Sequence, residues 1–298
     1  MSDSINAYDP VFSIHAGDVK SGGGSCGELN YLRFEDLINS FNHPAFLSLG
    51  DNGWTDCYRL SNGNYDPLDR LDYMRDRFYE GKGKGKGRKL GKGTAKTVLG
   101  SGEFEYNTFD KDYPEMHWWI YGHVMYVNAH IVGSNNALYD GVDRGCDPFL
   151  NIIDPGCMMA IDESEERTMV ANELVSAAFE VAEKKDLAGV LVAIQANMFG
   201  GPCNADRSVC DINQDVSMTN GFTDFWENLI EKTLEFGKPV VLFHGDSHYY
   251  QVFPNPDGRA ANLVAVQCPG SSDIGWVSVE VDPNSPQVFT FAHVDNTP

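Results

Sequence analysis

The sequence predicts an α/β fold, because short apolar runs typical of strands alternate with amphipathic helical segments along the chain. Four of these apolar runs end abruptly in polar side chains that can bind metal ions. The chain has 298 residues, enough for one large domain or two ordinary ones. Because the chain contains no interdomain linker apart from a lysine- and glycine-rich loop, we expect residues 1–298 to form a single α/β domain with its site at the strand ends.

The first half of the chain contains two predicted strands and two predicted helices. The strands are residues 11–16 (VFSIHA) and 45–49 (AFLSL), and each is followed by Gly-Asp. The helices are residues 28–41 and 66–80. The first helix is indicated by apolar side chains at the i, i+3, i+4 and i+7 positions: Phe34, Leu37, Ile38 and Phe41.

The second half continues the alternation. Residues 117–131 suggest two strands joined at Tyr121-Gly122, and a long helix is expected to end near Lys185. Asp162 and Glu165 have capping-box spacing, which predicts that this helix begins there. The remaining expected elements are a strand at 189–194, a helix at 222–236, a strand at 239–243 and antiparallel strands in the last 40 residues.

Composition excludes several classes of protein. The chain has 22 basic and 43 acidic residues, a formal charge of −21, so a nucleic acid would be repelled on average. The acidity indicates either solubility in a salty or extracellular setting, or carboxylates that converge on metal ions. No apolar run approaches the ~20 residues of a membrane helix, so no membrane is expected as partner. The opening MSDSINAYDP is polar and does not resemble a secretory signal.

A glycine- and lysine-rich segment is the only strong basic cluster. It begins with GKGKGKGRKLGKG at residues 81–93, and we expect a flexible loop over residues 81–96. The loop is either simply solvated or a lysine-rich flap that collects anionic substrate.

Seven cysteines occur without zinc-ribbon spacing. Cys146 with Cys157 and Cys203 with Cys210 bracket short segments, as disulfides often do. The alternative is scattered reduced thiols. Disulfides together with the acidity favour an extracellular or periplasmic location.

Potential metal ligands collect where the apolar runs end. The four segments are HAGDVKSGG at 15–23, SLGDNGWTDC at 48–57, AIQAN at 193–197 and LFHGDSHYY at 242–250. Sites in α/β sheets form at the carboxyl ends of strands, so these residues should meet at one edge. Their oxygen and nitrogen donors suit Fe, Mn, Zn or Mg. Each Gly-Asp is alternatively an ordinary capped turn.

These segments resemble a branch of the calcineurin-like metallophosphoesterases. The branch has the runs GDxKSGG, GDNEWTDC, HxVGSNN and HGDTHY, in this order. The corresponding runs here begin at Gly17 (GDVKSGG), Gly50 (GDNGWTDC), His130 (HIVGSNN) and His244 (HGDSHY). The resemblance covers residues 9 to 250, and it implies a four-layer α/β/β/α sandwich.

The resemblance also implies roles for individual residues. Asp18, Asp51, Asp246 and His248 would bind one or two divalent metal ions, with Asp18 as the bridging carboxylate. Asn52 and His130 would be catalytic, holding the phosphoryl oxygens or the leaving group. Gln195, His244 and Lys20 would support ligands or contact substrate, with Gln195 at the position of a ligand histidine. A disulfide between Cys26 and Cys57 would tie the first two motif loops together.

The implied reaction is hydrolysis of a small phosphate mono- or diester by a metal-bound hydroxide. Three departures from the family pattern bear on this expectation. The family's first motif is absent from residues 1–298, Gly53 replaces the branch's glutamate, and Gln195 and Asp246 stand where histidines are usual. The alternative is therefore a non-catalytic relative that binds an anionic ligand or a single metal.

Overall fold

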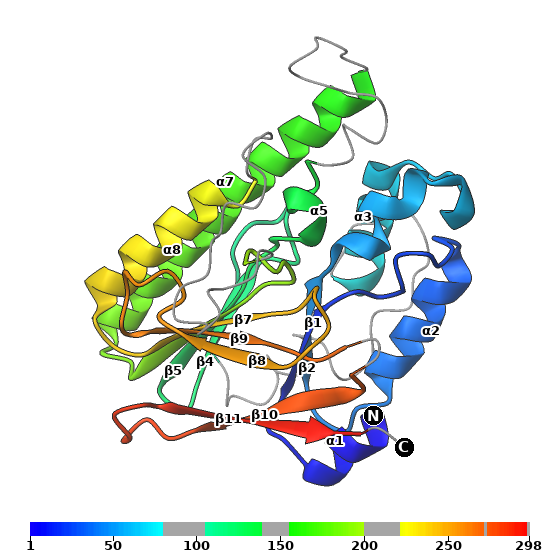
Figure 1. The fold of residues 1–298 in the computed structure, drawn as a ribbon. Helices are drawn as coiled ribbons and strands as arrows, with labels where there is room; N and C mark the ends of the chain where they lie inside the picture. Colours follow the sequence, from blue (N-terminus) through cyan, green and yellow to red (C-terminus); the bar gives the residue numbers. More distant parts are fainter. Residues whose placement is uncertain (80–104, 139–154, 200–220, 271–272, 297–298) are drawn as a thin grey trace.

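The computed structural model describes residues 1–79, 105–138, 155–199, 221–270 and 273–296 (Figure 1). Its helical elements are α1 (Ser2–Tyr8), α2 (Glu28–Asn39), α3 (Pro67–Phe78), α5 (Gly133–Asn136), α7 (Pro155–Lys184) and α8 (Thr223–Phe236). Three 3₁₀ turns, η1 (Asp51–Gly53), η2 (Thr55–Tyr58) and η3 (Leu60–Asn62), follow the second strand. The strands are β1 (Ser13–Gly17), β2 (Ala45–Leu49), β3 (Glu105–Thr108), β4 (His117–Tyr121), β5 (Val124–Asn128), β6 (Gly189–Ala193), β7 (Val240–His244), β8 (Gln251–Pro254), β9 (Leu263–Gln267), β10 (Gly275–Val281) and β11 (Phe289–Asp295).

Seven strands form one mixed sheet in the order β3-β4-β5-β6-β7-β9-β8. The central strands β5, β6, β7 and β9 are parallel, and the outer pairings are antiparallel. Strands β5, β6 and β7 are buried along their whole length, as expected for parallel strands that are covered on both faces. Their carboxyl ends therefore point the same way and form one edge.

Two smaller sheets complete the described strands. β1 and β2 pair in parallel, with Gly17 opposite Leu49 at their carboxyl ends. β10 and β11 form an antiparallel hairpin. The parallel pairing of β1 and β2 places the residues that follow them, Asp18 and Gly50-Asp51, next to each other.

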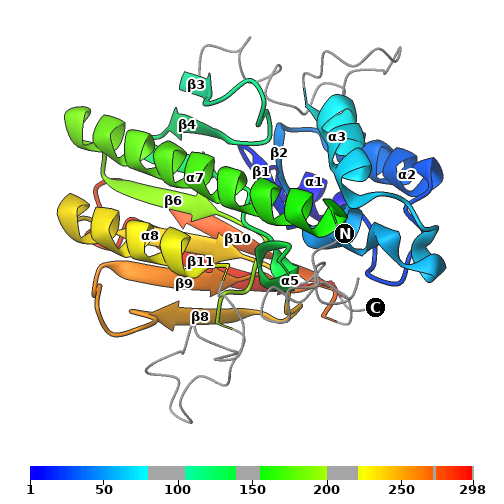
Figure 2. The ribbon, with the colours of Figure 1, turned by 90° about the horizontal axis from the view of Figure 1, so that it is seen from above.

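Three apolar cores hold these elements together. The first core packs α7 and α8 against one face of the large sheet, and Figure 2 shows these two helices side by side. A second core joins the opposite face of that sheet to the strands of both small sheets through Phe46, Trp119 and Phe289. The third core packs α2 and α3 against β2, around Phe34, Leu47 and other apolar side chains, and Phe34 also contacts His15 of β1.

The mixed α/β fold and most of the predicted elements are confirmed, while two details are wrong. Helix α7 begins at Pro155 rather than near Asp162, so Asp162 and Glu165 lie inside the helix and do not cap it. Proline is well tolerated in the first turn of a helix, which permits the earlier start. The segment around β9 was expected to be purely antiparallel, but it also pairs in parallel with β7.

The segment 81–96 lies outside the described residues. Among the helices that are described, none is long and apolar enough to span a membrane.

Candidate functional site

The carboxyl ends of four strands meet at one place. Asp18 follows β1, Asp51 follows β2, Gln195 lies just after β6, and Asp246 follows β7. Hydrogen bonds from Gln195 Nε2 reach Asp51 Oδ1 at 3.1 Å and Asp246 Oδ1 at 3.3 Å. The sequence analysis predicted this meeting of strand ends.

Glycine allows the small parallel sheet to approach the large one this closely. A Cβ built on Gly245 would lie 2.6 Å from the carbonyl oxygen of Ala16, and the backbone N–H of Gly245 donates to the carbonyl of Gln195. Atoms that close would clash, so a side chain at residue 245 would push β1 away from β7.

The three carboxylates are crowded and desolvated. Burial raises the pKa of Asp18 to about 8, aided by the negative charges of Asp51 and Asp246 and by a hydrogen bond with Asp51. Burial also raises the pKa of Asp246 to about 7, again with a contribution from Asp51. None of the ion pairs found in the described part of the chain includes any of these carboxylates. A cation placed among them would offset the charge repulsion that contributes to the raised pKa values of Asp18 and Asp246.

Asn52 lies beside Asp18 and Asp51 and donates hydrogen bonds to both carboxylates. Its side-chain Nδ2 donates to Asp18 Oδ2 at 2.6 Å. Its backbone N–H donates to Asp51 Oδ1 at 2.9 Å and to Asp18 Oδ1 at 3.2 Å. The predicted catalytic residue Asn52 is therefore in direct contact with two predicted metal ligands.

A left-handed turn covers the cluster. Four consecutive residues have positive φ angles of 52° to 70°: Ser134, Asn135, Asn136 and Ala137. Ser134 Oγ donates to Asp51 Oδ2 at 2.8 Å, and Arg167 holds the turn through the side chain and carbonyl of Asn136. Left-handed backbone is unfavourable for residues with a Cβ, by roughly 1–2 kcal/mol each, and such strain often accompanies functional sites.

His130 does not join the carboxylates. Its ring is buried, and Nδ1 donates to Glu115 Oε1 at 2.8 Å. Burial raises the pKa of Glu115, but the charge of Arg75 and the hydrogen bond from His130 outweigh burial and hold that pKa at about 2. Burial lowers the pKa of His130. The ring is thus held by a buried ion-pair network, which the sequence analysis did not identify.

The other predicted residues occupy three different surroundings. His248 is exposed and adopts a φ of 64°, and no hydrogen bond joins it to the carboxylates within the described residues. His244 is buried beside the rings of Phe199 and Phe253, and burial lowers its pKa to about 3. Lys20 Nζ donates to the Ser21 carbonyl, and burial lowers its pKa against the opposing effects of Asp56, Asp18 and Asp51.

A disulfide joins Cys26 to Cys57, as the family resemblance implied. Both residues are fully buried, and the bond connects the loop after Asp18 to the 3₁₀ turns after Asp51. Cys146, Cys203 and Cys210 lie outside the described residues, as does the side chain of Cys157. Cys268 is a free cysteine, and burial raises its pKa to about 12.

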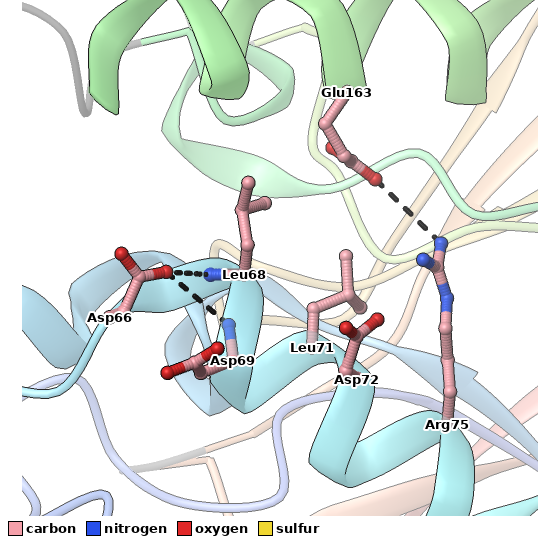
Figure 3. A pocket seen from close by; sticks show the side chains of 7 residues that line it. All are labelled: Asp66, Leu68, Asp69, Leu71, Asp72, Arg75 and Glu163. Carbon is pink, nitrogen blue, oxygen red and sulfur yellow. Dashed lines mark hydrogen bonds and ion pairs between the residues drawn. The ribbon is translucent and has the colours of Figure 1, made fainter. Parts of the chain in front are cut away.

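A separate cavity of about 340 Å³ lies between α3 and α7 (Figure 3). Its lining residues are Asp66, Leu68, Asp69, Leu71, Asp72, Arg75 and Glu163. None of the predicted site residues lines it. Arg75 connects the cavity to the buried network, because its guanidinium contacts both Glu163 and Glu115.

Across the residues that the structure describes, no three His, Cys, Asp or Glu side chains are arranged as a complete metal site. Asp18 and Asp51 nevertheless supply adjacent carboxylate oxygens, the donors preferred by hard divalent cations. No family model matches this chain, and no curated protein matches it.

Proposed function

We propose that the protein hydrolyses a phosphate mono- or diester with a divalent cation bound at Asp18 and Asp51. One observation carries this proposal: the carboxylates of Asp18, which is half-buried, and Asp51, which is buried, both accept the backbone N–H of Asn52 at a strand-end site, and no basic side chain among the described residues forms an ion pair with either. Two carboxylates held this close together are costly unless a proton or a cation compensates them.

The arrangement of cores supports assignment to a metallophosphoesterase-like α/β/β/α sandwich. Helices α7 and α8 cover one face of the large sheet, and the small sheets pack against its other face. Helices α2 and α3 lie beyond β1 and β2. This order corresponds to the four layers implied by the motif runs, and those runs contribute Asp18, Asp51 and Asp246 to the cluster.

The side chains around the cluster suit a phosphorylated substrate. When bound, a divalent cation withdraws charge from phosphoryl oxygens and makes a water molecule more acidic. Asn52 and Ser134 carry hydrogen-bond donors beside the carboxylates, so they can orient phosphoryl oxygens. An amide cannot supply a proton as an imidazolium does, and Asn52 therefore acts by positioning and charge stabilisation. The Lys20 ammonium adds positive charge next to Asp18 and Asp51.

Turnover of chromogenic phosphate esters tests this function. Protein freed of metal and reloaded with Mg²⁺, Mn²⁺, Zn²⁺ or Fe²⁺ should hydrolyse nitrophenyl phosphate or its diester, and Asp18→Asn should abolish turnover without unfolding the chain. Asp36→Asn, on the exposed face of α2, is the matched control and should retain full activity. Activity that survives in Asp18→Asn would refute the assignment.

A second candidate function is cation or anion binding without catalysis. It is favoured by the position of His130, whose ring is committed to Glu115 rather than to the carboxylate cluster. The same experiment separates the two functions. Metal binding that depends on Asp18, with no turnover of either ester under any of the four metals, would support the binding protein.

A further inference from the structure

We propose that Arg167, on helix α7 and outside the four motif runs, is a positioning residue of the site. Its guanidinium holds residues 134–137 in the left-handed conformation that brings the Ser134 hydroxyl to Asp51. The part that Ser134 plays in catalysis rests on the proposed function, whereas the hold of Arg167 on the turn does not.

The Arg167 side chain is fully buried, and all three of its nitrogen atoms are hydrogen-bonded. Nε donates to Glu163, one turn earlier in α7, and lies 3.0 and 3.1 Å from its two carboxylate oxygens. A buried charge is costly unless it is paired, and this ion pair within the helix compensates it. Both Nη atoms are therefore left to bond groups outside α7.

Those two Nη atoms bond the turn. Nη1 donates to Asn136 Oδ1 at 2.6 Å and to the His130 carbonyl at 2.8 Å, and Nη2 donates to the Asn136 carbonyl at 2.9 Å. Ser164 and Thr168 lie on the same face of α7 and form neutral hydrogen bonds with Asn136. Charge-assisted hydrogen bonds are about twice as strong as neutral ones, so Arg167 is the strongest anchor of the turn on α7.

Residues 134–137 need an anchor because their backbone is strained. A positive φ is unfavourable for a residue with a Cβ, and the cost adds up over four consecutive residues. Asn135 and Asn136 tolerate this conformation better than most residues, but Ser134 and Ala137 do not. A turn released from Arg167 would therefore move toward ordinary negative φ angles.

The turn places two groups at the carboxylates. Ser134 Oγ donates to Asp51 Oδ2 at 2.8 Å, and the N–H of Gly133 donates to Gln195 Oε1 at 2.6 Å. The Gln195 amide in turn donates to Asp51. Reversal of the φ angles would redirect the Ser134 side chain and the peptide groups beside it. Arg167 thus acts on the site through Ser134.

Arg167→Lys tests whether the forked guanidinium is needed. Lysine keeps the charge but has a single nitrogen, which cannot bond Glu163 and both acceptors of Asn136 as the fork does. The matched control is Arg77→Lys, which alters a comparable ion pair, with Glu35, between α2 and α3.

Hydrogen exchange measures the hold on the turn without any need for activity. The backbone amides of Gly133, Asn136 and Ala137 are hydrogen-bonded. They should exchange at least about tenfold faster in Arg167→Lys than in the parent or in Arg77→Lys. The amides of β6 are the internal reference for global stability. Turn amides that keep the parental rate, or that accelerate no more than those of β6, would overturn the proposal.

Turnover of nitrophenyl phosphate tests the step from the turn to the site. Arg167→Lys and Ser134→Ala should each lower kcat by about 100-fold, whereas Arg77→Lys should retain the parental kcat. The double variant Arg167→Lys, Ser134→Ala should lose no more than either single variant, because Arg167 acts through Ser134. Losses that multiply would show a separate structural role and overturn the proposal.

The two measurements separate this proposal from the proposed function. A parent that hydrolyses no phosphate ester refutes the function, and the exchange rates alone then decide whether Arg167 holds the turn. If Arg167→Lys does not fold, Asn136→Ala removes the acceptor at the other end of the same hydrogen bond and should accelerate exchange at Gly133 and Ala137 in the same way. Parental exchange rates in Asn136→Ala would overturn the proposal.

Discussion

Gly17 and Gln195 are packed so tightly that no side chain can be present at residue 17. A Cβ built on Gly17 would lie 2.4 Å from Gln195 Cγ, and the φ of Gly17 is +133°. This contact presses the end of β1 against the residue that follows β6. It therefore connects the small parallel sheet, which carries Asp18, to the large sheet, which positions Asp246.

Gly17→Ala should destabilise the protein by about 2 kcal/mol or more, because the new methyl group combines overpacking with an unfavourable backbone angle. Gly122→Ala is the control, since Gly122 also has a positive φ but no atom within 4 Å of a built Cβ. That control should cost about 1 kcal/mol, the backbone effect alone. Urea unfolding measures both values, and equal losses would show that the Gly17–Gln195 contact is not tight in solution.

The strand ends of the site could be predicted from sequence, but the contacts around them could not. Gly-Asp after an apolar run marks Asp18, Asp51 and Asp246 because the polypeptide must turn where a buried strand ends. The sequence does not reveal that the Gln195 amide points its NH₂ group inward, since that orientation is fixed by the N–H of Gly133, distant in sequence.

The left-handed turn was equally hidden, although its residues were part of a recognised run. Ser134 and Asn136 sit in HIVGSNN, yet polar residues after a strand predict an ordinary loop as readily as a strained one. The strain is maintained by Arg167 from the middle of α7. Glu115 was missed for a similar reason, because a single glutamate before a strand gives no sign that it is buried.

Glu115→Gln should destabilise the protein by about 3–5 kcal/mol. The substitution removes one charge from a buried network and leaves Arg75 without its principal partner. Glu180→Gln is the control, because its ion pair with Lys184 is exposed on α7 and should contribute little. Thermal and urea unfolding of the two variants give the comparison, and a small effect at Glu115 would mean that solvent reaches the network.

Acidification should unfold the protein partly through its buried histidines. Burial lowers the pKa of His15 and of His117 to about 4. Between pH 6.5 and 4 these histidines are protonated in the unfolded chain but largely neutral in the folded chain. The free energy of unfolding therefore falls as the pH decreases. Each histidine should contribute a loss of about 2 kcal/mol between pH 7 and pH 5.

His117→Phe tests this pH dependence. The ring packs against the rings of Phe46 and Trp119, so phenylalanine fits the surroundings and cannot titrate. The free energy of unfolding of His117→Phe should change less between pH 7 and pH 5 than that of the parent, by about 2 kcal/mol. An unchanged slope would show that His117 is protonated in the folded chain.

Breaking the Cys26–Cys57 disulfide should destabilise the protein by about 3–4 kcal/mol, because a 31-residue separation closes a moderately long loop in the unfolded chain. The Cys26→Ser, Cys57→Ser double variant should also bind cations more weakly, since the bond joins the loops that follow Asp18 and Asp51. Cys268→Ser is the control, because it leaves the disulfide intact. A reductant should lower the stability of Cys268→Ser but should not change that of the double variant. If the double variant matched the parent in both unfolding and cation affinity, the loops would be held by their other contacts, such as the hydrogen bond from Tyr31 to the Gly53 carbonyl.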